Sequence, residues 1–297
     1  MIQERFAGML KMFSDFSNSD MTVSFSYDFS HDAFLELRNK YGLCNIAGSG
    51  NDLSKTLELL RWVSENVRHD GEYDNHVAEN SLDLLEYAFE KSDRGINCRA
   101  LSTILTECLL AIGIPARIFY LMPLSPYERD NHVVVGAYIE SSGKWVMIDP
   151  TYNCYFMNES GIVLSPWEAR DSIANRSEIF INDDLFYNDS GMSPEKIKAI
   201  YFEYMSKNLF YMRSSVNNSY DCLRSGGFVH LCPNGYDVAR SLKLNKEFRG
   251  QSGFQEDILY VSLECFTAAP DCFNSGSETL LDKGVGIWQE NSSGRWG

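Results

Sequence analysis

Residues 98–149 constrain the fold more than any other part of this sequence. Residues 98–112 place apolar side chains at the i, i+3, i+4 and i+7 spacing of a buried helical face. Gly113 and Pro115 follow, as expected where a helix ends. Three strand-like segments come next: 116–122, 132–139 and 144–149. These patterns predict an α+β fold, with a helix followed by three strands.

The sequence leaves the register of the last two strands open. Their turn lies within residues 140–143, which include two serines and a glycine. A turn centred at the end of this stretch would pair Asp149 with Gly136. An earlier turn, or a bulge, would place Asp149 opposite His132.

Other segments give weaker predictions. Upstream, the patterns predict a strand at 22–29 and helices at 52–67 and 81–91. Downstream, they predict a helix at 194–212, loops with short strands over 214–253, and a buried strand at 258–266. We divide the chain into an N-terminal strand and helix segment (1–45), a core (46–170), and a C-terminal extension (171–297) that could pack on the core.

Composition limits the partners of this chain. It has 297 residues, 44% of them hydrophobic, and a net charge of −15. Such an acidic chain repels phosphate backbones and has no basic patch, so we expect no nucleic-acid partner. No segment approaches the ~20 apolar residues of a membrane helix. Gly8, Lys11 and Ser14 interrupt the N-terminal apolar stretch, so we see no signal peptide and expect a cytoplasmic protein, unless a leader was trimmed.

The eight cysteines are scattered and form no CxxC pair. In a cytoplasmic chain the expectation is free thiols. A zinc site could be imagined from Cys222, His230, Cys232, Cys265 and Cys272, but their spacings differ from those of zinc knuckles. We therefore expect no metal and no other cofactor.

Cys98 combines a reactive side chain with the start of a helix. Asn97 is a favourable N-cap after the flexible Gly95, so Cys98 falls in the first helical turn. The unpaired N–H groups and the helix dipole there favour a thiolate and offer an oxyanion pocket. The alternative is a small buried side chain, since Cys98 shares a helix face with Leu105.

His132 and Asp149 are candidates for the base and its orienting carboxylate. His132 opens strand 132–139, from which an imidazole could reach a thiol at a helix tip. Asp149 closes strand 144–149 and could hold the imidazole tautomer. The alternatives are a solvent-facing histidine and a turn aspartate before Pro150. The remaining histidines lie in polar or irregular stretches and are weaker candidate bases: His31, His69, His76 and His230.

Three segments resemble the transglutaminase-like superfamily of cysteine enzymes. They are GINCRALSTILTECLLAIGIPAR around Cys98, NHVVVGAYIESSGKW around His132, and WVMIDPTY around Asp149. The upstream helix LELLRWVSENVRHDG resembles the segment that precedes the nucleophile in that family. The resemblance covers about residues 50–155, with the motifs in the family's order.

The resemblance implies a papain-like core, in which the nucleophile helix packs on an antiparallel sheet. It implies Cys98, His132 and Asp149 as a catalytic triad. It also implies acyl transfer from a protein or peptide amide through a thioester, to water or to an amine. The second oxyanion donor of the family is not evident, and Asn97 and Trp62 are the candidates. Calcium sites like those of animal transglutaminases are not evident either.

We favour a hydrolase, because cross-linking needs a channel that excludes water and admits an amine. The alternative is a module that kept the fold, lost turnover and acts in binding or as a scaffold. An intact triad argues against that alternative. Aromatic residues of the second half could line a substrate cleft or pack in the core: Tyr201, Phe202, Tyr204, Phe210 and Tyr211.

Overall fold

The computed structural model describes residues 2–188, 190–222, 227–251 and 258–271. Its helices are α1 (Ile2–Met12), α2 (Asp32–Tyr41), α3 (Leu43–Ala47), α4 (Asp52–Asn66), α5 (Ser81–Glu90), α6 (Cys98–Ala111), α7 (Pro166–Asn175), α8 (Pro194–Asn208), α9 (Val238–Phe248), α10 (Leu263–Thr267) and the short 3₁₀ helix η1 (Glu140–Ser142). Its strands are β1 (Ser26–Tyr27), β2 (Arg68–His69), β3 (Gly95–Ile96), β4 (Ala116–Met122), β5 (His132–Ile139), β6 (Lys144–Ile148), β7 (Phe156–Met157), β8 (Phe180–Ile181), β9 (Tyr211–Ser215), β10 (Asn217–Asn218), β11 (Phe228–Leu231) and β12 (Leu259–Tyr260).

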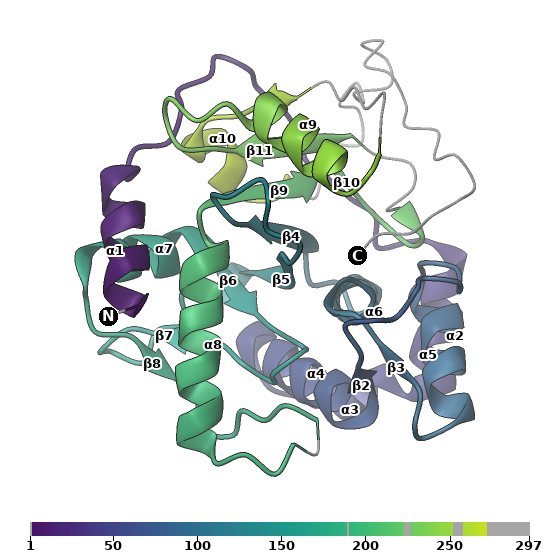
Figure 1. Cartoon of the computed structure of the whole chain (residues 1–297). Helices are drawn as coiled ribbons and strands as arrows, with labels where there is room; N and C mark the ends of the chain where they lie inside the picture. Colours follow the sequence, from purple (N-terminus) through teal and green to yellow (C-terminus); the bar gives the residue numbers. More distant parts are fainter. Residues whose placement is uncertain (1, 189, 223–226, 252–257, 272–297) are drawn as a thin grey trace.

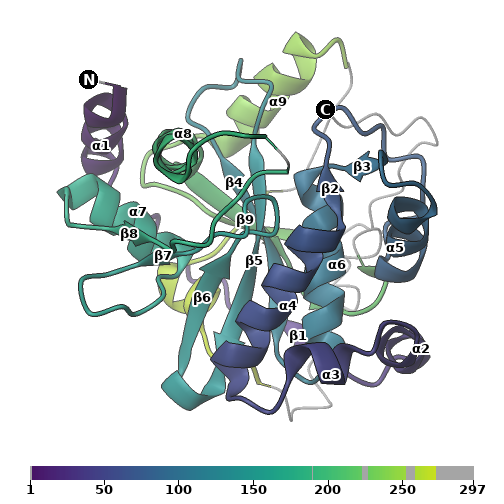
Figure 2. The ribbon, with the colours of Figure 1, turned by 90° about the horizontal axis from the view of Figure 1, so that it is seen from below.

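A six-stranded sheet in the order β12-β11-β9-β4-β5-β6 forms the centre of the molecule (Figure 1). All neighbouring strands run antiparallel except β11 and β12, which are parallel. Helices α4 and α6 lie along one face, and α1, α7 and α8 lie on the other (Figure 2). The predicted α+β class is confirmed, with the addition that the parallel edge strand makes the sheet mixed.

Strands β4 and β5 are buried on both faces. One hydrophobic core lies between the sheet and α4 and α6, and a second lies under α1, α7 and α8. The sequences ARIFYLM and HVVVGAYI are therefore almost continuously apolar instead of alternating. This double burial fixes the position of His132, the first residue of β5.

The elements predicted between residues 52 and 149 are confirmed to within one residue at nearly every boundary. The two strands at 116–122 and 132–139 have the predicted bounds, and α6 ends one residue before the predicted position 112. These boundaries have local causes, since the Asn97 side chain caps α6 and Gly143 adopts a left-handed conformation at the turn before β6.

The predictions for the C-terminal region are wrong in part. The helix predicted at 194–212 ends at Asn208, and β9 begins at Tyr211. The stretch 214–253 contains a helix, α9, whose apolar stripe is narrow. The strand predicted at 258–266 stops at Tyr260, because Ser262 caps the short helix α10.

The N-terminal prediction also needs correction. The alternating pattern at 22–29 yields only the two-residue strand β1, which pairs in parallel with β10 far along the chain. Alternating apolar and polar residues form a strand only where a neighbouring strand pairs with them, and the other residues of 22–29 have no such neighbour. The segment 1–45 is mostly helical, and α1 packs on α7.

Strands from the predicted C-terminal extension belong to the central sheet. β9 pairs with β4, and β11 and β12 continue the sheet beyond it. The division at residues 45 and 170 stays a prediction, but residues from both sides of position 170 build one sheet.

We predict that Gly136→Ala lowers the free energy of unfolding by about 1–3 kcal/mol, because the added methyl would overlap the ring of Phe119 in the filled core. Urea unfolding measures this loss. Gly8→Ala is the matched control, since nothing lies within 4 Å of a Cβ there and alanine favours the helix by about 0.5–1 kcal/mol. Equal stability of Gly136→Ala and the parent protein would contradict this account of the core.

Candidate active site

Cys98 is the first residue of α6, the helix that packs on β4 and β5. The side-chain oxygen of Asn97 accepts a hydrogen bond from the backbone N–H of Ala100 at 3.1 Å, which fixes the start of the helix. The Cys98 side chain is partly buried and packs with Tyr120 and Val133. The thiol therefore lies at the positive end of the helix dipole, where the first N–H groups have no partners within the helix.

His132 and Asp149 form a buried pair. Nε2 of His132 lies 2.5 Å from Oδ2 of Asp149, and the residues are 1% and 0% exposed. The second carboxylate oxygen accepts the backbone N–H of Thr151 at 2.8 Å. Because the carboxylate engages Nε2, Nδ1 is the ring nitrogen that remains for another partner.

The register of β5 and β6 explains how this pair forms. Val135 pairs with Ile148, so the next step of the ladder puts Asp149 across from Val134. Neither of the two pairings expected from the sequence is therefore present. His132 is the diagonal neighbour on the same face, at a backbone separation of roughly 7–8 Å that an imidazole and a carboxylate can bridge.

The chain after β6 holds Asp149 in place. The backbone N–H of Asp149 donates to the carbonyl of Cys154 at 2.8 Å, and the N–H of Cys154 donates to the carbonyl of Asp149 at 3.1 Å. The hydroxyl of Ser64 on α4 donates to the carbonyl of Pro150 at 2.9 Å. These hydrogen bonds fix the backbone at Asp149 and at the residue that follows it, and so they position the carboxylate.

A second imidazole, that of His69, lies at the thiol. The short strands β2 and β3 run parallel and pair His69 with Ile96, two residues before Cys98. Gly95 permits this close approach, because a Cβ at that position would lie 2.7 Å from the Cβ of Asp70. From the sequence His69 is one of the weaker candidate bases, and its position just after a predicted helix is the only signal that points to it.

Two residues from the C-terminal region hold His69. Its backbone N–H donates to Oδ1 of Asn188 at 2.9 Å, and the amide of Asn188 donates to the His69 carbonyl at 3.0 Å. The ring nitrogen Nδ1 lies 3.1 Å from the hydroxyl of Tyr187. This contact leaves Nε2 of His69 to interact with the thiol.

The surroundings of Cys98 favour its thiolate. Burial alone raises the pKa of the thiol, but hydrogen bonds and charge interactions with His132 and His69 outweigh it and lower the pKa from 9.0 to about 6. Burial alone lowers the pKa of His132, but the charge of Asp149 and hydrogen bonds to Asp149 and Cys98 raise it above its ordinary value. The two shifts favour a thiolate–imidazolium pair near neutral pH.

The side chains of the two oxyanion candidates proposed from the sequence have other partners. Asn97 uses its oxygen as the helix cap and its amide to donate to Oδ1 of Asn75 at 2.8 Å. The partly buried ring of Trp62 packs with Tyr41 and the exposed Phe89 at the edge of the core under the helices. The structure therefore brings Cys98, His132 and Asp149 together with His69, and it does not bring the Trp62 ring to them.

Aromatic rings from residues that follow Asp149 in the chain pack against the two imidazoles. The ring of Tyr204 on α8 meets His132 edge-on, with centroids 5.0 Å apart. The ring of Tyr152 lies 6.3 Å from His132 and stacks on Tyr187 at 4.9 Å. The other aromatic residues considered for a cleft belong to the core or pack against it: Tyr201, Phe202, Phe210 and Tyr211. Of these, Tyr201 lies next to Asp149 and interacts with its carboxylate.

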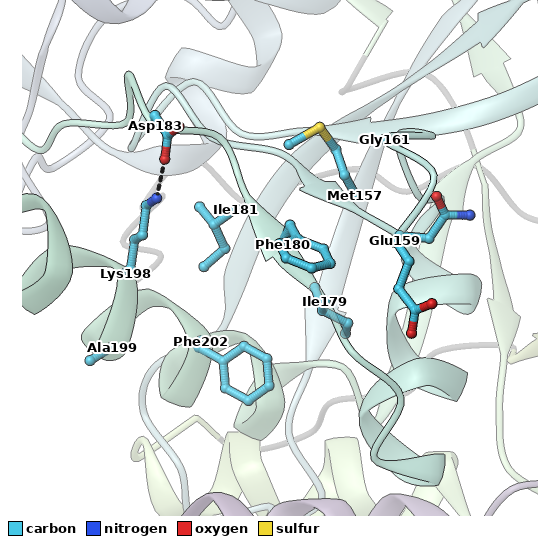
Figure 3. Close-up of a pocket in the computed structure, with 11 residues that line it drawn as sticks. Met157, Glu159, Gly161, Ile179, Phe180, Ile181, Asp183, Lys198, Ala199 and Phe202 are labelled. Atoms are coloured by element: carbon cyan, nitrogen blue, oxygen red, sulfur yellow. Dashed lines mark hydrogen bonds and ion pairs between the residues drawn. The ribbon is translucent and has the colours of Figure 1, made fainter.

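A pocket of about 560 Å³ lies between α8 and the antiparallel pair of β7 and β8. Figure 3 shows Phe202, Phe180 and Ile181 around it, while Lys198 reaches Asp183 across one side. Cys98, His132 and Asp149 are not among its lining residues. The pocket shares α8 with the site but does not contain the reactive groups.

Within the described ranges, no group of three or more histidine, cysteine, aspartate or glutamate side chains is placed to hold a metal ion. Of the residues considered for zinc, His230 is fully buried, and burial lowers its pKa to about 3. Cys272 lies outside the described residues. No helix in the part of the chain that the structure covers is long and apolar enough to cross a membrane.

Comparison with known families agrees with this geometry. Residues 42–150 match the family model of the transglutaminase-like superfamily. This match confirms the resemblance to that superfamily that the motifs indicated. The match contains Cys98, His132 and Asp149 and ends directly after Asp149.

A comparison with curated proteins gives no match. Among solved structures, the chain is similar to the 1.9 Å crystal structure of a candidate cysteine protease from Cytophaga hutchinsonii, with 21% identity and a TM-score of 0.31. The similarity covers 54% of this chain and 53% of that chain, so it spans about half the length of each.

We predict that iodoacetamide alkylates Cys98 with half-maximal rate near pH 6, because the thiolate reacts and the pKa of Cys98 is lowered to about 6. His132→Ala removes the larger of the two imidazole contributions, so the midpoint should rise by about 1–3 pH units. Peptide mass spectrometry over a pH series gives the midpoints, with the exposed Cys44 as the reference thiol in the same sample. A midpoint that is unchanged in His132→Ala would rule out the ion pair.

Proposed function

We propose that this protein is a cysteine-nucleophile hydrolase that cleaves peptide or side-chain amide bonds through a thioester. The observation that supports this most directly is the lowered pKa of Cys98 at a helix N-terminus, beside an imidazole that a buried carboxylate engages at 2.5 Å. The transglutaminase-like match over residues 42–150 agrees with cysteine-based catalysis. Cys98 is the nucleophile, His132 the acid and base, and Asp149 the orienting group.

In the first step the Cys98 thiolate attacks the carbonyl carbon of the amide. The carbonyl oxygen becomes an oxyanion, and the backbone N–H of Cys98 donates to it. We assign the second donor to Nε2 of His69, whose other ring nitrogen lies against Tyr187. The C–N bond then breaks, the His132 imidazolium gives its proton to the leaving amine, and a thioester remains.

In the second step water attacks the thioester. Neutral His132 takes a proton from the water, and the C–S bond breaks. The products are a carboxylic acid and the Cys98 thiolate, and the imidazolium is restored. Asp149 holds the ring through Nε2 in both steps, which keeps Nδ1 directed at the sulfur and the incoming water.

We expect Cys98→Ala to abolish turnover of a fluorescently labelled unfolded protein, assayed for both new peptide ends and released ammonia. Cys44→Ala is the matched control, since Cys44 is an exposed cysteine of α3 outside the site. Asp149→Asn should lower kcat by a factor on the order of 10² to 10⁴, because the ring loses its orienting charge. Unchanged activity of Cys98→Ala would refute the proposal.

The alternative of a scaffold without turnover gives a different result. A scaffold has no need for an activated thiol, so Cys98 would react with iodoacetamide no faster than the exposed Cys44. A fast Cys98 combined with no turnover of any amide substrate would favour a binding module that kept the site.

We propose water as the acceptor, and isotopic labelling tests this. In ¹⁸O water the newly formed carboxylate should carry one labelled oxygen, and an added primary amine should not appear in the product. Mass spectrometry of the products with and without the amine separates the two cases. Covalent incorporation of the amine, at the expense of ¹⁸O, would identify a transferase instead.

A further inference from the structure

The connection between β4 and β5 leads directly into His132 and is fastened by residues beyond the family match. The Tyr236 hydroxyl donates to the carbonyl of Leu124 at 2.7 Å. The side-chain amide of Asn245 on α9 donates to the carbonyls of Pro126 and Glu128 at 2.7 and 3.0 Å. The connection is therefore anchored along its length before it reaches the base.

Tyr204 on α8 provides the last of these anchors, next to His132. Its hydroxyl lies 3.0 Å from Oδ1 of Asp130 and 3.1 Å from the carbonyl of Asn131, the residue before His132. Burial raises the pKa of Tyr204, so the hydroxyl stays protonated and remains a donor. One turn further along α8, Lys207 lies 3.7 Å from a carboxylate oxygen of Asp130.

The ring of Tyr204 also contacts the imidazole itself. The two ring centroids are 5.0 Å apart, with an angle of 64° between the planes. His132 is thus held at three points: by Asp149 at Nε2, by the Tyr204 ring against its side, and by the Tyr204 hydroxyl through the preceding carbonyl. These contacts leave Nδ1 of His132 directed at Cys98.

We infer that Tyr204 is a positioning residue for the proposed hydrolysis, which holds the His132 imidazole in line with the Cys98 thiol. This inference rests on the proposed function, since it assigns Tyr204 a role only where His132 acts on Cys98. It also gives helix α8, which lies outside the matched region, a defined part in the site. The His132 ring is held by Asp149 at Nε2 and by the Tyr204 ring at its side. It cannot turn Nδ1 away from the sulfur without breaking one of these contacts.

The test is the pH dependence of Cys98 alkylation in Tyr204→Phe. Phenylalanine keeps the ring against His132 and removes only the hydroxyl that fastens Asn131. We expect the alkylation midpoint to rise by about half a pH unit or more, with a rate at pH 6 reduced roughly threefold or more, because a less constrained imidazolium stabilises the thiolate less. Tyr204→Leu, which also removes the ring edge, should shift the midpoint further.

Tyr236→Phe is the matched control. It removes one tyrosine hydroxyl with two hydrogen bonds, to Leu124 and to Ser241, from the far end of the same connection. Both phenylalanine variants should lose similar thermal stability, but only the one at position 204 should shift the midpoint. Equal midpoints in the parent protein and Tyr204→Phe, or equal shifts in both variants, would overturn the inference.

Alkylation separates this inference from the proposed function. If Cys98 of the parent protein shows no lowered midpoint, the thiolate–imidazolium pair is absent and the proposed function fails. If the parent midpoint lies near pH 6 and Tyr204→Phe does not move it, the proposed function stands and only the role of Tyr204 is refuted. Should Tyr204→Leu fail to fold, the comparison of Tyr204→Phe with Tyr236→Phe decides the inference by itself.

Discussion

The chemistry of the site depends on a buried ion pair. The Asp149 carboxylate has no exposed surface, and it lies beside the equally buried imidazole of His132. Removing two charges from water costs several kcal/mol for each ion unless their geometry and hydrogen bonds compensate. Here one oxygen faces His132 and the other accepts the N–H of Thr151. The enclosed negative charge stabilises an imidazolium, and the imidazolium in turn lowers the pKa of Cys98. The carboxylate therefore influences the pKa of the thiol through His132, without touching the sulfur.

The sheet makes this relay possible. His132 and Asp149 are diagonal neighbours only while β5 and β6 keep the register that pairs Val135 with Ile148. A slip by one residue would turn one side chain to the other face. Covering both faces of β5 opposes such a slip, because Val134 packs in one core while Val135, Ala137 and Ile139 pack in the other. The packing of the ring of Phe119 over Gly136 is one such constraint. Core packing and the pKa of the nucleophile are thus linked through the register of one strand pair.

Features with local causes could be predicted from the sequence, and features built by distant segments could not. Asn97 caps α6 from within its own turn, so the helix carrying Cys98 was predictable. The place of His69 depends on a parallel pairing of two-residue strands, for which no periodic signal exists. Tyr204 lies on a predicted helix, but its contact with His132 depends on how α8 crosses the sheet. Helix α9 was missed because Val238 and Leu242 are its only buried apolar residues in a polar segment.

The family match ends at residue 150, yet further groups that hold the two imidazoles come from beyond it. Tyr187 and Asn188 fix His69, and Tyr204 borders His132. An imidazole near a sulfur is useful only while its nitrogen points at the reacting atoms, and a misplacement of about 1 Å can cost two orders of magnitude in rate. Within the core alone, His132 is oriented by a single carboxylate that leaves the ring side uncovered. The C-terminal region supplies the missing constraints, which gives a physical reason for its strands to join the central sheet instead of forming a separate body.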